Sequence, residues 1–353
     1  MFQDQNMLRM VDANANRARE ALRVLEDYCR FALNDNALSA ELKAIRHGMA
    51  GALAALGPAA ILARDTTNDV GTTNKTQREL VRESLADVVL AAGKRLSEAL
   101  RVMEECAKSA DPAAARTLEG LRYRGYVIEQ QLVRTLQASA RFGEARLYVL
   151  LTEALCHAAH GGWVGTLEQI LSGAAAAGRA GQLVVQLREK SLESGELLAR
   201  ARQVAERCRA VGAISIINDR PDIAHLANAD GVHLGQSDLP CADVRKLLGP
   251  AAIIGVSTER VEQARQAQRD GATYIGVGPM FATTTKEKPR IAGPAYAAEA
   301  VREVSLPAVA IGGITLENVG QVTGAGIRCV AVCQAVIAQA DTAGATKAFL
   351  GKL

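Results

Sequence analysis

Residues 274–286 of this 353-residue chain read YIGVGPMFATTTK, an apolar run that passes directly into a loop of glycine, threonine and lysine. The run at 274–277 has the length and the β-branched content of a buried strand. The loop after it offers backbone N–H groups freed by glycine, the hydroxyls of Thr283 and Thr285, and the ammonium group of Lys286. These donors suit a phosphorylated ligand, although an ordinary solvated loop is the alternative.

Seven more apolar runs of this kind lie between residues 147 and 333, separated by Ala-rich amphipathic segments. The eight expected strands are 147–152, 183–188, 213–218, 231–234, 253–257, 274–278, 308–312 and 329–333. Strands that alternate with amphipathic segments are typical of parallel β–α units. Residues 146–353 are therefore expected to form an α/β domain, a (β/α)₈ TIM barrel. The alternative is a doubly wound open sheet, but no Gly-x-Gly-x-x-Gly motif follows the first strand.

Residues 1–142 follow a helical period instead, and we expect an all-α domain there. Ala18, Leu22, Leu25 and Cys29 form one apolar stripe. The sequence EALRVLE at 20–26 recurs as EALRVME at 98–104. This repeat predicts two equivalent helices of a bundle, related by a local pseudo-twofold axis.

The composition is that of an ordinary soluble protein, with 49% hydrophobic and 22% charged residues. A net charge of +3 is too small to indicate nucleic-acid binding. Seven scattered cysteines without a Cys-x-x-Cys pair indicate neither a disulfide framework nor a structural zinc site. The start of the chain lacks the apolar core of a signal peptide, and no run approaches the roughly 20 apolar residues of a membrane span. We therefore expect a cytoplasmic protein with no membrane or nucleic-acid partner.

The active site of a TIM barrel lies at the C-terminal ends of its strands, so we take candidate residues from those ends. Alternation along the second strand sends Gln186, Arg188 and Lys190 to one side, where an amide and two cations can meet a phosphate. A surface cluster of Arg188, Glu189 and Lys190 is the alternative.

Two carboxylates, Asp219 and Asp238, follow the third and fourth strands. Hard oxygen ligands opposite cationic groups suit Mg²⁺ that bridges a diphosphate. Each carboxylate could instead cap the next helix. His233, inside the fourth strand, fits a core position and a site position equally well. Ser257 ends the fifth strand, and Gly313 follows the seventh, where its backbone N–H can approach a phosphate.

These residues together resemble the thiamine phosphate synthase family over residues 146–353. The matching motifs are Gln186-x-Arg-x-Lys190, Asn218-Asp219, Asp230-Gly-x-His-x-Gly-Gln-x-Asp238-Leu-Pro, Ile254-Gly-x-Ser257, Gly276-x-Gly-Pro-x-Phe-x-Thr-x-Thr285-Lys286 and Ile311-Gly-Gly-Ile314. The family joins a hydroxymethylpyrimidine diphosphate to a thiazole phosphate and releases pyrophosphate. The resemblance therefore implies these two small-molecule substrates.

The resemblance also implies a role for each matched residue. It gives Gln186, Arg188, Lys190 and Asn218 to the pyrimidine diphosphate, together with Ser257 and Lys286. Arg188, Ser257 and Lys286 are the implied catalytic residues, and Asp219 and Asp238 the implied Mg²⁺ ligands. Thr283, Thr285 and the Gly313 amide are implied to hold the thiazole phosphate. After the eighth strand the chain departs from the family, because Cys333-Gln334 replaces a small aliphatic residue and serine. Side-chain contact with the phosphate at this position is therefore open.

The helical half resembles the domain that precedes thiamine phosphate synthase in some bacterial fusions and is assigned as a hydroxymethylpyrimidine phosphate kinase. The resemblance implies ATP as a further ligand, although the half has no Gly-rich P-loop. Its candidate residues are Asn14, Arg17, Glu20, Arg64, Asp65, Asp69, Arg95 and Glu98.

Two questions stay open, and one competing reaction is discounted. The helical half could be a dimerisation or docking module on a monofunctional synthase, with Arg17 and Glu20 forming ion pairs on a helix face. The oligomeric state is open, and a homo-oligomer is one option. An isomerase or aldolase reaction in the barrel would need an acid–base pair or a Schiff-base lysine. Glu189 and Lys190 are the nearby candidates, and we discount this reaction because Lys190 belongs to the diphosphate cluster.

Overall fold

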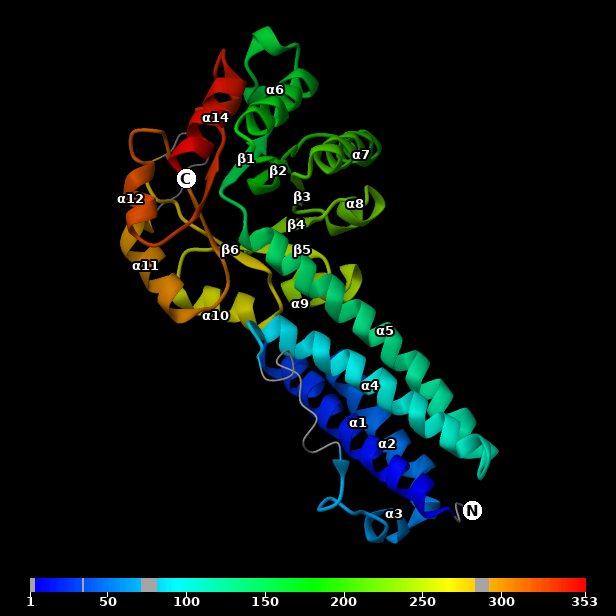
Figure 1. Ribbon diagram of the computed structural model, residues 1–353. Helices are drawn as coiled ribbons and strands as arrows, with labels where there is room; N and C mark the ends of the chain where they lie inside the picture. The colour runs from blue at the N-terminus through cyan, green and yellow to red at the C-terminus, as the bar shows by residue number, and fades with distance from the viewer. Residues whose placement is uncertain (1–3, 34, 71–80, 283–291) are drawn as a thin grey trace. The chain divides into compact units, whose positions relative to one another are not determined.

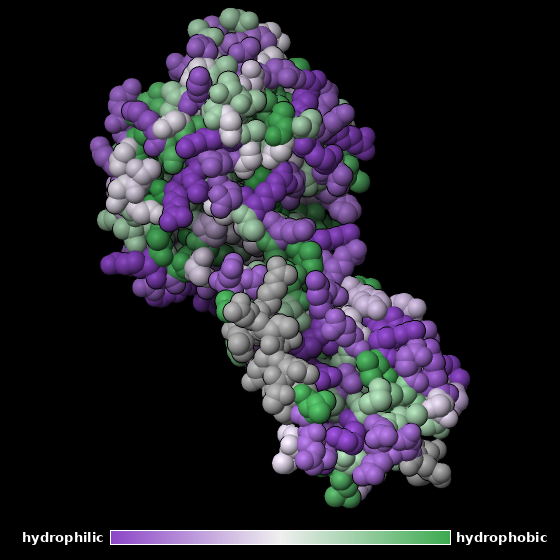
Figure 2. Space-filling model, viewed as in Figure 1, coloured by the Kyte–Doolittle hydropathy of each residue, from purple (hydrophilic) through white to green (hydrophobic). Residues whose placement is uncertain are grey.

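The computed structural model describes residues 4–33, 35–70, 81–282 and 292–353. The chain divides into two compact units, Met1–Leu136 and Gln137–Leu353 (Figure 1). The first unit is helical and the second contains the eight-stranded barrel. Among the described residues, no helix is both long and apolar enough to cross a membrane. The face of the chain in Figure 2 is mostly hydrophilic, with small separate hydrophobic patches.

The helical unit is built from long amphipathic helices with polar N-caps. The helices of this part of the chain are α1 (Gln5–Phe31), α2 (Asn36–Ala52), α3 (Ala59–Leu62), α4 (Leu85–Lys108) and α5 (Pro112–Gly143). Asp4 caps α1 by accepting from the N–H of Asn6 at 2.8 Å, and Ser84 caps α4 by accepting from that of Asp87 at 3.1 Å. Helix α5 supplies residues to both units, because the second unit begins at Gln137.

The repeated sequence falls on α1 and α4, which pack directly against each other. Leu22 and Leu25 in the first copy, and Leu100 and Met103 in the second, are fully buried in one core. Burying such side chains contributes roughly 1.5–3 kcal/mol each. The two predicted helices are therefore confirmed.

Both copies of the repeat end in a buried glutamate that binds two arginines. In the first copy Glu26 lies 3.4 Å from Arg23 and 3.6 Å from Arg46 of α2. In the second copy Glu104 lies 2.7 Å from Arg101 and 2.8 Å from Arg122 of α5. Each helix pair is thus joined by an equivalent Glu–Arg contact.

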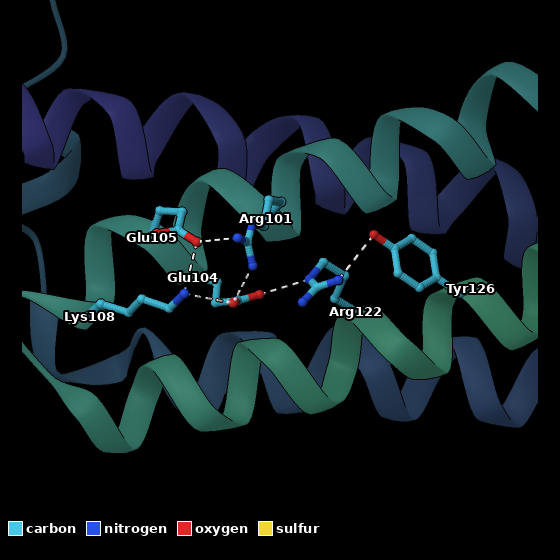
Figure 3. Close-up of polar contacts among 6 residues, drawn as sticks. All are labelled: Arg101, Glu104, Glu105, Lys108, Arg122 and Tyr126. Carbon is cyan, nitrogen blue, oxygen red and sulfur yellow. Dashed lines mark hydrogen bonds and ion pairs between the residues drawn. The ribbon is translucent and has the colours of Figure 1, made fainter.

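Glu104 is the more tightly enclosed of the two glutamates, and Figure 3 shows its contacts. Only 1% of its side chain is exposed, and its carboxylate also accepts from Lys108 at 3.3 Å. Arg122 in turn donates to the Tyr126 hydroxyl at 3.1 Å. Burial by itself would raise the pKa of Glu104, but the contacts with Arg122, Lys108 and Arg101 outweigh it and hold the pKa below its ordinary value.

The second unit contains a closed barrel of eight parallel strands, which confirms the TIM-barrel prediction and excludes the open sheet. The strands are β1 (Leu147–Leu151), β2 (Leu183–Leu187), β3 (Ile214–Asn218), β4 (Gly231–Leu234), β5 (Ile253–Thr258), β6 (Tyr274–Val277), β7 (Ala308–Ile311) and β8 (Cys329–Val332). All eight were expected, with ends that differ by at most one residue. Pairing of β1 with β8 closes the barrel, with Leu147 opposite Val330.

Helices cover the outside of the barrel, as Figure 1 shows. They are α6 (Trp163–Ala176), α7 (Ser194–Val211), α8 (Pro221–Leu226), α9 (Cys241–Leu248), α10 (Val261–Arg269), α11 (Gly293–Glu303), α12 (Val319–Gly324), α13 (Gln334–Ile337) and α14 (Thr342–Lys352). Strand alternation sorts the apolar side chains into two layers. Val185 and Leu187 belong to the layer that packs on the helices, whereas Val184 belongs to the barrel interior.

The last turn of α5 lies against the N-terminal end of the barrel. Phe142 is buried and stacks on the ring of Tyr274, with centroids 4.2 Å apart and planes inclined by 16°. Arg141 binds the Asp230 carboxylate at 2.5 Å and the Ala213 carbonyl at 2.7 Å. The N-terminal end of the barrel is therefore closed by α5, and the C-terminal ends of the strands remain open.

Candidate functional site

A cavity of about 970 Å³ opens at the C-terminal ends of the barrel strands. It is lined by every predicted barrel residue that the structure describes. These are Gln186, Arg188, Lys190, Asn218, Asp219, Asp238, Ser257, Gly313, Cys333 and Gln334. Thr283, Thr285 and Lys286 lie outside the described residues, so their positions stay predictions.

The cationic side of the cavity is set by the segment after β2. Arg188 and Lys190 line the cavity, whereas Glu189 between them does not. The Glu189 carboxylate accepts from the N–H of Glu153 at 2.7 Å and lies 3.8 Å from Arg200. Glu189 therefore fastens this segment to the loop after β1 and leaves the two cations facing the cavity, as alternation predicted.

Two carboxylates from neighbouring strand ends meet in the cavity. The Asp219 and Asp238 carboxyl groups are close enough to interact electrostatically, and Lys190 Nζ lies 3.8 Å from Asp219 Oδ2. Burial and the adjacent Asp238 raise the pKa of Asp219. The helix-capping alternative is wrong for both residues, because neither α8 nor α9 has a side-chain cap.

The backbone at Asp219 is held in an uncommon conformation. Its φ is 60°, and the flanking residues are joined by a hydrogen bond of 2.8 Å from Arg220 N–H to the Asn218 carbonyl. The Asp219 N–H donates to the His233 carbonyl of β4 at 2.9 Å. A left-handed conformation outside glycine costs about 1–3 kcal/mol and clusters at functional sites. Here it turns the carboxylate toward Asp238.

A row of polar side chains crosses the cavity floor. Ser257 Oγ lies 2.8 Å from His233 Nε2, and His233 Nδ1 lies 2.9 Å from the Tyr274 hydroxyl. The Tyr274 hydroxyl lies 2.9 Å from that of Tyr148, to which Gln186 Nε2 donates at 2.9 Å. His233 is therefore a site residue, which the sequence left undecided.

Sequence reasoning missed Tyr148 and Tyr274. Both lie at inward positions of their strands, and the core of the barrel interior includes them. Gly255 is the one local signal, because a Cβ atom there would come 2.0 Å from Tyr274 Cζ. Desolvation lowers the pKa of the enclosed His233 to about 4, so its ring is neutral near pH 7.

The opposite wall of the cavity is formed by the glycines after β7. Gly312 and Gly313 have φ values of 103° and 63°, and a Cβ on Gly313 would approach the Ala282 carbonyl oxygen to 2.4 Å. The Asn318 amide donates to the Gly313 carbonyl at 2.8 Å and holds the turn. Only glycine fits this backbone and its close approach to the loop after β6.

The unusual pair Cys333-Gln334 also lines the cavity. Cys333 is half-buried, and desolvation raises the pKa of its thiol to about 11, so it is protonated near pH 7. Gln334 is exposed at the first residue of α13. A contact between either side chain and a phosphate stays a prediction.

The helical unit has a cavity of its own, of about 690 Å³. Five of its eight predicted residues line it, namely Asn14, Arg17, Arg64, Asp65 and Asp69. The other three, Glu20, Arg95 and Glu98, are exposed and do not line it. The structure thus restricts the candidate site to the first half of α1 and the loop after α3.

Asp12 and Arg9 also line this cavity and were not among the candidates. Asp12 is buried and binds Arg64 through two hydrogen bonds of 2.7 and 2.8 Å, and this contact raises the pKa of Arg64. Arg9 donates to the Asp65 carbonyl at 3.5 Å. The loop after α3 is therefore fastened to α1 at two points.

No group of three or more His, Cys, Asp or Glu side chains that could hold a metal occurs within the described part of the chain. A metal at the barrel carboxylates would have Asp219 and Asp238 as its carboxylate ligands and could take further oxygens from a ligand or water. This is the usual arrangement for Mg²⁺ bound with a phosphate compound.

A model of the thiamine monophosphate synthase family matches residues 154–336, and a model of the ThiD2 family matches residues 9–131. The chain is 40% identical over 349 residues to a thiamine-phosphate synthase of Synechocystis sp., covering 98% of this chain and 96% of the relative. It is also 40% identical over 344 residues to that of Rhodopirellula baltica, covering 95% and 89%. Thiamine phosphate pyrophosphorylase from Pyrococcus furiosus superposes with a TM-score of 0.52 and 29% identity, covering 60% of this chain and 96% of that chain.

Proposed function

This chain belongs to the thiamine monophosphate synthase family, and we propose that its barrel joins hydroxymethylpyrimidine diphosphate to thiazole phosphate with release of pyrophosphate. The observation that carries this proposal is the cavity at the C-terminal end of the barrel. It gathers, from separate strand ends, the eight described residues that the motifs singled out, together with Cys333 and Gln334. One wall is cationic and suits a diphosphate, and one is acidic and suits a divalent cation. The third is a glycine turn, whose backbone N–H groups suit a second phosphate.

The proposed reaction needs a stabilised leaving group and no protein nucleophile. The bond between the methylene carbon of the pyrimidine and the diphosphate oxygen breaks, and its electron pair leaves with pyrophosphate. The thiazole nitrogen then donates its lone pair to the resulting carbocation and forms the new C–N bond. Arg188 and Lys190 face the cavity, where their fixed positive charges would stabilise the charge that develops on pyrophosphate.

The acidic wall fits Mg²⁺. Asp219 and Asp238 supply hard carboxylate oxygens from neighbouring strand ends, and both side chains line the cavity. Bound there, Mg²⁺ would neutralise diphosphate oxygens and assist their departure. Lys190, 3.8 Å from Asp219, would share that task.

Two measurements test the synthase. Incubation of the full chain with both substrates and Mg²⁺ should form thiamine phosphate and pyrophosphate in equal amounts. Chelation of the metal should stop the reaction. Failure to form thiamine phosphate from pure substrates would reject the proposal.

For the helical unit we propose a kinase that transfers a phosphoryl group from ATP to the pyrimidine monophosphate. A monophosphate oxygen would attack the γ-phosphorus, and ADP would leave with the bond's electron pair. The supporting observation is the 690 Å³ cavity, in which five predicted residues meet. The product would be the substrate of the barrel, with residues 1–142 and 146–353 as the two functional domains. A cytoplasmic location remains a prediction of the sequence.

The kinase competes with a docking or dimerisation role for the same unit. Full-length protein supplied with monophosphate, ATP and Mg²⁺ should release ADP and form the diphosphate. A chain that couples preformed diphosphate but neither binds ATP nor releases ADP would favour the docking role. Measuring the mass of the chain in solution would then show whether this unit makes a homo-oligomer.

A further inference from the structure

The polar row on the cavity floor is a continuous chain of four hydrogen bonds between two predicted substrate-binding residues. It runs from Gln186 through Tyr148, Tyr274 and His233 to Ser257, and each separation is 2.8 or 2.9 Å. The five residues come from five strands, and all of them line the cavity. Every hydroxyl has only one hydrogen to donate, so the direction of one hydrogen bond in such a row decides the direction of the next.

Counting those protons gives the chain a direction. Gln186 Nε2 donates to the Tyr148 oxygen, so the Tyr148 hydrogen is available for the Tyr274 oxygen. The Tyr274 hydrogen then goes to His233 Nδ1. A ring nitrogen that accepts carries no proton, so the ring proton of His233 lies on Nε2. His233 Nε2–H donates to Ser257 Oγ, which leaves the serine hydrogen for a ligand.

The two ends of the chain are therefore coupled. In this direction Ser257 offers a donor to the cavity, and Gln186 offers the acceptor Oε1. Rotating the Gln186 amide by half a turn would reverse every bond, so that Ser257 would accept and Gln186 would donate. Mixed states leave a buried hydroxyl or ring nitrogen unpaired, which costs about 1–3 kcal/mol.

We propose that this row of hydrogen bonds sets the donor and acceptor pattern of the cavity floor. Tyr148, Tyr274 and His233 are positioning residues, which make Ser257 donate to the ligand while Gln186 accepts from it. The matching ligand carries an acceptor where it meets Ser257 and a donor where it meets Gln186, and an aminopyrimidine offers both, as ring nitrogens and an amino group. This choice of ligand rests on the proposed synthase function, in which the aminopyrimidine is the substrate. The proton order itself does not depend on that function.

The proton order can be measured without substrate. In full-length protein with ¹⁵N-labelled histidine, NMR should show His233 as the neutral tautomer protonated on Nε2, with its signals assigned by their loss in His233→Gln. Protonation on Nδ1 would overturn the proposal, because it requires the opposite direction. The measurement itself uses wild-type protein, and His233→Gln is needed only to assign the signals.

A substitution at the Gln186 end of the row should reverse the direction of the hydrogen bonds at the Ser257 end. An ionised carboxylate can only accept, so Gln186→Glu should move the His233 proton from Nε2 to Nδ1 through the two intervening tyrosines. The carboxyl ¹³C shift identifies the pH at which the introduced group is ionised. Adding Tyr148→Phe should cancel the reversal, and Gln339→Glu, which alters another glutamine of the same cavity, should leave the tautomer unchanged. An unchanged tautomer in Gln186→Glu with an ionised carboxylate would refute the coupling.

Substrate choice gives a separate readout. We expect wild-type protein to prefer the aminopyrimidine diphosphate over an analogue with an oxo group in place of the amino group by about 100-fold in kcat/KM. Tyr148→Phe should reduce that preference by about tenfold, which corresponds to one buried hydrogen bond. An unchanged preference would contradict the selective role. Absence of coupling with either substrate would instead count against the synthase, while the NMR result would still stand.

Discussion

Arg64 and Asp12 are joined by two parallel hydrogen bonds of 2.7 and 2.8 Å, although they lie 52 residues apart in the chain. The contact is bidentate, so both donors of the guanidinium on this side are taken by one carboxylate. It fixes the loop after α3 over the cavity of the helical unit. The motif predicts Arg64 as a ligand-binding residue, and the contact with Asp12 shows that it also holds the loop after α3 against α1.

We expect Arg64→Ala to lower ADP formation by about 100-fold, because the loop that carries Asp65 loses its anchor. Arg64→Lys should not restore the rate, since one ammonium group cannot reproduce the two parallel bonds. Coupling of preformed diphosphate should continue in both variants. Arg116→Ala, at an exposed position of α5, is the matched control. ADP formation near the wild-type rate in Arg64→Ala would remove this loop from the kinase proposal.

The carboxylate pair of the barrel predicts a metal dependence. Asp219→Ala and Asp238→Ala should each lower thiamine phosphate formation by about 100-fold or more, because the charge that would hold Mg²⁺ is halved. The rate should be followed as a function of Mg²⁺ concentration. Asp243→Ala, whose side chain is 62% exposed on α9, should behave as wild type. Near wild-type coupling in either variant would show that the metal assignment is wrong.

Two cations are predicted to act on the leaving group. Loss of one buried charge-assisted contact costs about 2–4 kcal/mol, so Arg188→Ala and Lys286→Ala should each reduce kcat by roughly 30- to 1000-fold. For Lys286 this expectation rests on the motif alone. Lys246→Ala, with a side chain 77% exposed, is the control. A change confined to the KM for thiazole phosphate would assign these residues to the other substrate.

The buried ion pair of the helical unit predicts a large effect on stability. Glu104→Gln leaves the enclosed Arg122 without its carboxylate and should destabilise the unit by about 3–5 kcal/mol. Glu105→Gln, the next residue, removes a half-exposed carboxylate and should cost no more than about 1 kcal/mol. Hydrogen exchange of α4 and α5 in the full chain reports on this unit separately. Equal protection in the two variants would contradict the prediction.

The same glutamate predicts acid sensitivity. Because folding lowers the pKa of Glu104 below its ordinary 4.5, the ionised form stabilises the folded unit at all pH values above 4.5. That contribution is lost as the pH falls below 4.5 and through the folded pKa. Exchange protection of α4 should therefore decline over this window, and the decline should be smaller in Glu104→Gln. A steeper decline in the variant would show that another group is responsible.

Local patterns in the sequence were sufficient to predict the fold. The eight strands could be located because each is an apolar run bounded by polar residues, and this pattern can be recognised from neighbours along the chain alone. The same alternation correctly placed Arg188 and Lys190 on the cavity side and left Glu189 outside it. Strand-end residues could be predicted as one group, because parallel strands bring their carboxyl ends to the same rim.

The contacts between distant polar groups were decided by the tertiary structure alone. The Tyr148 and Tyr274 hydroxyls meet across 126 residues, and in sequence each tyrosine looks like an ordinary core residue. Glu20, Arg95 and Glu98 matched a motif yet lie outside the cavity, because a motif does not say which helix face is covered. Periodicity along a chain reports which side chains are buried. Which buried polar groups become partners is decided only when the barrel and the bundle close, since an unpaired one would be costly.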